Sequence, residues 1–98
     1  MPPASSSPGS AERASTYLVE HYWPGINVEI FRSATERVRT TAESMARDGV
    51  PIRFRHSTLV PKDEAAFCVF DAESAELIKE LYARAGVRFE RIVAAVEV

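Results

Sequence analysis

Two segments of the chain repeat apolar residues at intervals of three and four, the spacing that one face of an α-helix requires. The first lies between Asn27 and Gly49, and its apolar face consists of Ile30, Ala34, Val38, Thr41 and Met45. The second lies between Ser74 and Gly86, and its apolar face consists of Ile78, Leu81, Tyr82 and Ala85. Asn27 and Ser74 are residue types that cap the start of a helix, and glycine commonly follows its end. The pattern therefore predicts two helices.

Four other segments are expected to be β-strands. Residues 16–23 are rich in β-branched and aromatic side chains, and residues 89–98 close the chain as a last strand. Residues 52–60 alternate between two sets of side chains, Ile52, Phe54, His56 and Thr58 against Arg53, Arg55, Ser57 and Leu59. Residues 65–71 are apolar on both faces, which is typical of a central strand. The short polar turn at residues 61–64 joins these two strands as an antiparallel hairpin.

The predicted order of elements is βαββαβ, the split βαβ or ferredoxin-like arrangement. Its fold class is α+β, with a four-stranded antiparallel sheet that carries two helices on one face. Right-handed crossovers place the first and third strands in the centre, the second beside the third and the fourth beside the first. We expect residues 16–98 to form this single domain. Residues 1–15 are rich in serine and proline, and we expect them to be a disordered tail.

The other face of the predicted sheet has no helix left to cover it. The apolar side chains expected there are Leu18, Tyr22, Phe67, Val69 and Val93. An exposed apolar patch on a small domain usually marks an interface. A homodimer in which two such faces meet is the simplest way to bury the patch, so we expect a homodimer.

Composition and charge narrow the range of partners. Hydrophobic residues make up 46% of the chain and charged residues 27%, as in ordinary soluble globular proteins. The formal net charge of -2 provides no positive field for nucleic acid. The longest apolar run, residues 65–70, is far shorter than the ~18 residues of a spanning helix, and no export signal is evident. The single cysteine, Cys68, cannot form an intrachain disulfide. We expect a cytoplasmic protein without nucleic-acid or membrane partners.

The sequence contains none of the familiar catalytic or phosphate-binding motifs, so candidate chemistry depends on which side chains share a face. His21, His56 and Cys68 are the only histidines and the only cysteine, and each lies in a predicted strand. The third strand lies between the first and second, so Cys68 would have one histidine on either side. Adjacent strands are ~4.8 Å apart, so the three side chains can ligate a soft or borderline metal if they share a face.

The register of the hairpin decides whether they share that face. An odd-length loop pairs His56 with Cys68, whereas an even-length loop places Arg55 and Ser57 on the Cys68 face. The odd length is favoured because it matches apolar positions with apolar positions. The shared face would then lie beneath the helices, where histidine and cysteine are often simply packed and hydrogen-bonded. An inert core cluster therefore stands as the alternative to a metal site.

A second candidate set is expected on the uncovered face, consisting of Glu20, Tyr22, Arg53 and Arg55. A carboxylate in the middle of a central strand is unusual, and burial in a dimer favours its protonation unless an arginine or a metal compensates. One interpretation is an ion pair or hydrogen-bonded network that fixes the dimer register. The other is a polar anchor in a small cavity, acting as general base, ligand contact or metal ligand.

Three stretches of the chain together resemble a family of small bacterial ferredoxin-like proteins, some of whose members are described as nickel-binding. The stretches are TYLVEHYWPG, RDGVPIRFRHSTLVPKDEAAFCVF and SAELIKELYARAGVRFERI. The resemblance implies a homodimer with its sheets face to face and, in some members, bound nickel. It also implies a histidine, histidine and cysteine at His21, His56 and Cys68, and the glutamate of YLVE at Glu20. Val87 occupies a position where several members carry histidine.

Two hypotheses of different classes follow. The first is a small homodimeric binding protein for a divalent metal, nickel by resemblance, with the two histidines, Cys68 and Glu20 as candidate ligands. The second is a small enzyme or organic-ligand binder of the dimeric α/β-barrel type, in which Glu20 is an acid or base and Arg53 or Arg55 holds an anion. A purely structural role is a third reading.

Overall fold

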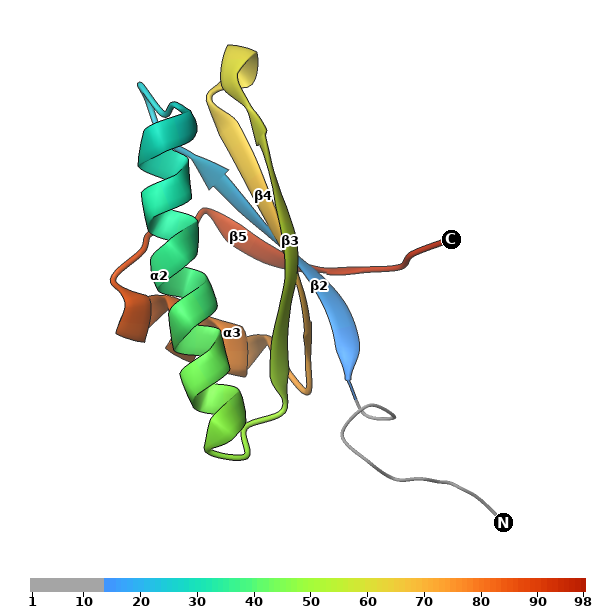
Figure 1. The fold of residues 1–98 in the computed structure, drawn as a ribbon. Helices are drawn as coiled ribbons and strands as arrows, with labels where there is room; N and C mark the ends of the chain where they lie inside the picture. The colour runs from blue at the N-terminus through green and yellow to red at the C-terminus, as the bar shows by residue number, and fades with distance from the viewer. Residues whose placement is uncertain (1–13) are drawn as a thin grey trace.

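The computed structural model describes residues 14–98, which form one antiparallel sheet with two helices (Figure 1). The strands are β2 (Ser15–Tyr22), β3 (Ile52–Val60), β4 (Ala65–Ala72) and β5 (Arg91–Ala95). The helices are α2 (Val28–Arg47), α3 (Ala75–Ala85) and a 3-10 turn, η1 (Pro61–Asp63), between β3 and β4. Most of the predicted tail, residues 1–15, lies outside the described residues, and Ser15 already belongs to β2.

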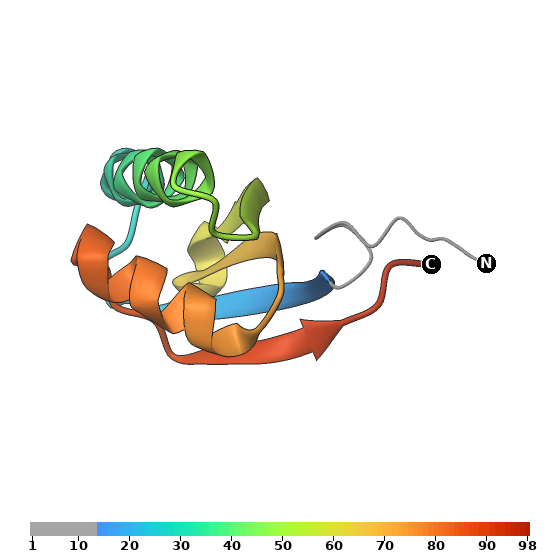
Figure 2. The same ribbon diagram turned by 90° about the horizontal axis from the view of Figure 1, so that it is seen from below.

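The strands follow the order β3-β4-β2-β5, and every neighbouring pair is antiparallel. This topology confirms the predicted ferredoxin-like α+β fold. Figure 2 views the molecule from below and shows α2 and α3 on the same side of the strands. We call the opposite side, which no helix of residues 14–98 covers, the open face. No helix in this described range is long and apolar enough to cross a membrane.

Both helices begin and end near the residues that the sequence indicates. The Asn27 side chain accepts a hydrogen bond of 2.9 Å from the Ile30 N–H and caps α2. The chain then leaves α2 through Gly49 at φ +90° and leaves α3 through Gly86 at φ +70°. Glycine adopts this left-handed conformation without a steric penalty, so it can end each helix sharply. Ser74 occupies the N-cap position of α3 without a capping bond from its side chain.

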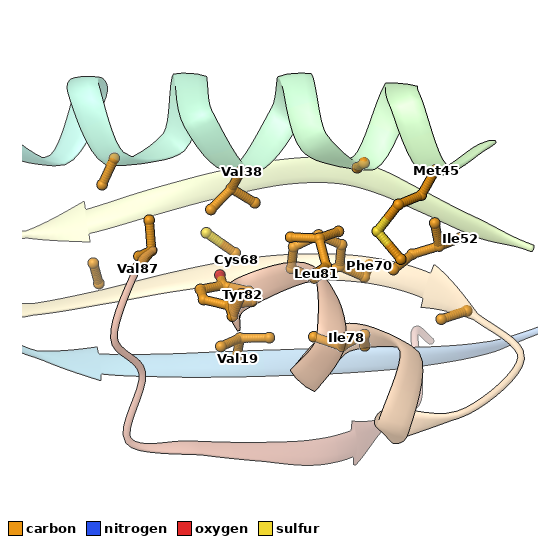
Figure 3. Packing of buried hydrophobic residues seen from close by; sticks show 14 of the residues in the cluster. Val19, Val38, Met45, Ile52, Cys68, Phe70, Ile78, Leu81, Tyr82 and Val87 are labelled. Atoms are coloured by element: carbon orange, nitrogen blue, oxygen red, sulfur yellow. The ribbon is translucent and has the colours of Figure 1, made fainter. Parts of the chain in front are cut away.

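The hydrophobic core lies between the two helices and the covered face of the sheet (Figure 3). Its largest fully buried side chains are Tyr82, Phe70, Met45, Ile78, Leu81, His21, Val19, Val38 and Cys68. The predicted apolar face of α2 is wrong at its first position, because Ile30 is 50% exposed and Phe31 is buried instead. The Phe31 ring packs edge-on against the rings of His21 and Trp23, which explains why α2 presents this neighbour to the core.

A β-bulge in β3 changes the hairpin register within the strand. Near the turn, Ser57 lies opposite Cys68, as an even-length loop requires. Beyond the bulge, Phe54 lies opposite Phe70, as an odd-length loop requires. Arg55 is the extra residue without a partner, and it shifts the alternation by one position. Both predicted registers therefore occur, one on each side of Arg55.

The prediction that His56 pairs with Cys68 was wrong for this reason. His56 lies opposite Val69, whose neighbour on β2 is Leu18 on the open face. The bulge instead brings Leu59, opposite Ala66, to the covered face, where it packs against the core. Burial of a leucine in place of a histidine favours this register, because apolar burial stabilises the fold and an unpaired imidazole does not.

Leu81 provides a test of the core. Leu81→Ala should lower the free energy of unfolding by about 2–5 kcal/mol, because it removes buried carbon atoms and leaves a cavity. Leu77 is only partly buried on the same helix, so Leu77→Ala is the matched control and should cost less. Denaturant unfolding followed by circular dichroism measures both variants. Equal losses would contradict the described packing of α3.

Candidate functional site

His21 and Cys68 are connected through Tyr82 beneath the helices. His21 Nδ1 lies 3.0 Å from the carbonyl oxygen of Ala66, so this nitrogen carries the proton and donates it. His21 Nε2 lies 3.0 Å from Tyr82 Oη and accepts the hydroxyl proton. The Tyr82 hydroxyl also interacts through a hydrogen bond with the Cys68 thiol, towards which it points in Figure 3. The result is a continuous chain of hydrogen bonds from Cys68 to the backbone of β4.

This buried network is electrically neutral. His21, Cys68 and Tyr82 are each 1% exposed. Burial lowers the pKa of His21, partly offset by its bond to Ala66. Burial raises the pKa of the Cys68 thiol to about 11 and also raises the pKa of Tyr82. A protonated thiol is a poor metal ligand and a poor nucleophile. The network thus resembles the inert core cluster that the sequence left open as an alternative.

His56 does not belong to this network. Its side chain is exposed on β3, next to Val69 in the register of the open face. Within residues 14–98, no group of three or more His, Cys, Asp and Glu side chains is placed to hold a metal ion. The structure therefore brings His21 and Cys68 together and leaves His56 on the other side of the sheet, so these three side chains do not form one metal site among residues 14–98.

Glu20 lies on the open face and is paired there. Its Oε2 lies 3.0 Å from Arg91 Nη2, and the Tyr22 hydroxyl lies 3.5 Å from its Oε1. Glu20 is 8% exposed although no second sheet covers it here. The sequence pattern alone did not indicate Arg91 as its partner. The register between the first and last strands could have indicated this ion pair, because it sets Glu20 directly opposite Arg91.

Arg55 takes part in a separate set of charges at the other end of the open face. Its Nη1 lies 3.5 Å from Asp71 Oδ1 and 2.5 Å from Glu97 Oε1. Thr16 donates a hydrogen bond of 3.1 Å to the same Asp71 oxygen. The bulge, β4, β2 and the segment after β5 are therefore tied together by one ion-pair cluster.

Glu20 and the two arginines that were predicted to share a cavity with it lie at different positions along the sheet. Glu20 lies opposite Phe67 and Arg53 lies opposite Asp71, four residues further along β4. At ~3.3 Å per residue the two positions are about 13 Å apart along the strand. The two arginines and His56 instead border a groove of about 740 Å³ between α2 and β3, over the apolar side chains of Ala42, Ala46, Ile52 and Phe54.

These features define a small α+β protein with a hydrogen-bonded network in its core and an open sheet face that carries paired charges. The chain belongs to the SCO4226-like family of nickel responsive proteins, whose sequence profile matches residues 17–94. The fold is also that of SCO4226 from Streptomyces coelicolor A3(2), known from a crystal structure. The two share a TM-score of 0.72 and 16% sequence identity over 86% of this chain and 99% of that chain. No curated protein sequence matches the chain significantly.

The buried His21 should make stability depend on pH in mild acid. The unfolded chain binds a proton on this imidazole near pH 6.5, whereas burial lowers the pKa of His21 in the folded protein. Below pH 6.5 the unfolded state therefore binds more protons, and the free energy of unfolding falls by up to about 1.4 kcal/mol per pH unit. Above pH 6.5 the imidazole is neutral in both states, and the stability it contributes is fully present.

Urea unfolding between about pH 5 and about pH 7.5 measures this dependence, because this range spans the ordinary pKa of histidine. The slope below pH 6.5 should become smaller in His21→Gln. His56→Gln is the matched control, because it removes the exposed histidine, and its slope should equal that of the unsubstituted protein. If the slope became smaller in His56→Gln and not in His21→Gln, the pH dependence would not come from His21.

Cys68 should be unreactive in the folded protein. Its thiol is 1% exposed and its pKa is raised to about 11, so little thiolate is present and reagents cannot reach it. Labelling by an aromatic disulfide reagent near pH 8 should be slow, and it should accelerate by about two orders of magnitude or more in denaturant. Ser33→Cys places a thiol on the exposed side of α2 as a control that reacts at once. Fast labelling of Cys68 in the native protein would overturn this prediction.

Proposed function

We propose that this chain is a homodimeric binding protein for a divalent metal, nickel, and that its two protomers meet through their open faces. The observation that carries the proposal is the position of His56, the accessible imidazole, on the face that no helix covers. Membership in a family of nickel responsive proteins supports nickel as the ion. The metal is the ligand of the protein, and no reaction is assigned.

The open face has the composition of a dimer interface. Its central apolar side chains are only partly buried in one chain, namely Leu18, Phe67, Val69 and Val93, and Tyr22 is 48% exposed. A single domain of this size buries a modest share of its surface, so a second sheet would add apolar burial. Glu20 is already paired with Arg91, so covering it would not leave an uncompensated charge.

The donor atoms favour a metal site that both protomers build. One chain supplies the exposed imidazole of His56 and the open-face carboxylate of Glu20, which is too few donors to enclose an ion. A twofold axis doubles each donor, and imidazole with carboxylate suits nickel and its neighbours in the first transition row. His21 and Cys68 would contribute only if the Tyr82 hydroxyl left His21 Nε2, which would break a buried hydrogen bond.

Metal analysis of untagged protein, purified without a nickel resin, tests the proposal. Equilibrium dialysis against nickel should give stoichiometric binding, and sedimentation should give a dimer. His56→Ala should weaken nickel binding by about tenfold or more, because loss of one ligand from a site with few ligands removes much of its affinity (about 1.4 kcal/mol for each factor of ten).

Cys68→Ala is the matched control, since it removes the other sequence-predicted ligand type from the core without touching the open face. Its nickel affinity should equal that of the unsubstituted protein. Loss of nickel in Cys68→Ala with retention in His56→Ala would move the site into the core. A protein that binds no nickel at all would refute the metal proposal, and a monomer would refute the dimer.

A further inference from the structure

We propose that residues 96–98, the segment after β5, form an arm that docks on the open face of a second copy of this chain. The inference rests on the proposed homodimer and adds a specific contact to it. The arm lies outside residues 17–94, the range that the family profile matches.

The arm leaves the sheet on the side where a partner would lie. β5 ends at Ala95, which is opposite Thr16 near the start of β2, so the residues that follow have almost no strand left to pair with. Figures 1 and 2 both show the chain running on from β5 on the side away from the helices. The sequence Val-Glu-Val in this arm is rich in β-branched residues, which favour an extended conformation.

The exposure of the arm is unusual for its composition. Val96 is 85% exposed and Val98 is fully exposed, and they are the most exposed large hydrophobic residues of the described chain. By contrast, the apolar residues of β5 itself, Ile92 and Val93, are partly buried. Two solvated valines in an unpaired segment gain little within one chain, but burying them against an apolar surface would be favourable.

Glu97 sets the direction of the arm. Its carboxylate is 2.5 Å from Arg55 on the far edge strand, so it is turned back towards its own sheet. In an extended segment successive side chains point to opposite sides, so Val96 and Val98 are directed away from that sheet. The ion pair thus holds the arm near its own sheet, and the exposure of Val96 and Val98 leaves both side chains accessible to a partner.

The second copy is the occupant that fits this arrangement. Its open face presents the partly buried apolar side chains of Leu18, Val69 and Val93, which can receive two valines. The anchoring charges are already matched, because Arg55 is shared between Asp71 and Glu97. Each protomer of a face-to-face dimer would give one arm and receive one, so the contact would form twice.

The dissociation constant of the dimer tests the arm. The double variant Val96→Ser, Val98→Ser should raise this constant by about tenfold or more, because four valines per dimer would no longer bury apolar surface. Val28→Ser is the matched control, since Val28 is 50% exposed at the start of α2. Its dissociation constant should match that of the unsubstituted chain. Sedimentation equilibrium measures all three proteins, and thermal melts confirm that each is folded.

The outcomes separate the arm from the dimer. If the unsubstituted chain is a dimer and the double serine variant has the same dissociation constant, the arm is refuted and the proposed homodimer stands. If the unsubstituted chain is a monomer at all concentrations, both proposals fall. Equal weakening in Val28→Ser would also refute the arm, because the effect would then not be specific to residues 96–98.

Discussion

The extra residue at Arg55 decides what each face of the sheet carries. Without it, a single alternation along β3 would place either Leu59 or Phe54 on the solvent side. The bulge turns both towards the helices and leaves His56 outside. It also frees Arg55 from the ladder, so that the guanidinium can reach Asp71 and Glu97. One inserted residue therefore determines which side chains of β3 face the core. It also leaves the His56 imidazole accessible and allows Arg55 to bind Glu97.

The covered face contains a second feature on which the fold depends, a hydrogen-bonded network of polar side chains inside an apolar core. Every buried polar atom of His21 has a partner, on β4 through Ala66 and on α3 through Tyr82. Such a network contributes modest net stability, but breaking it leaves groups unsatisfied, so it specifies how α3 seats on the sheet. The same completeness explains why this cluster is a poor place for an ion, although it contains the donor types that metals prefer.

Local signals in the sequence were sufficient for most of the fold. The cap at Asn27, the glycine that ends α3 and the bounds of β3 each depend on a few neighbouring residues, and each is confirmed. The candidate site was harder to predict because it depends on contacts between distant residues. Tyr82 had the spacing of an ordinary core residue, and nothing in that spacing indicates that its hydroxyl reaches His21, 61 positions away. A one-residue bulge likewise leaves the hydrophobic pattern almost unchanged while it moves His56 across the sheet.

Glu20 and His21 are consecutive residues of β2 whose side chains lie on opposite sides of a sheet one layer thick. The carboxylate belongs to the exterior set of charges and the imidazole to the interior network, with a single peptide unit between them. Any twist of the β2 backbone that redirects one side chain must redirect the other as well. One peptide unit of β2 therefore joins the paired charges of the open face to the hydrogen bonds that hold α3 on the sheet.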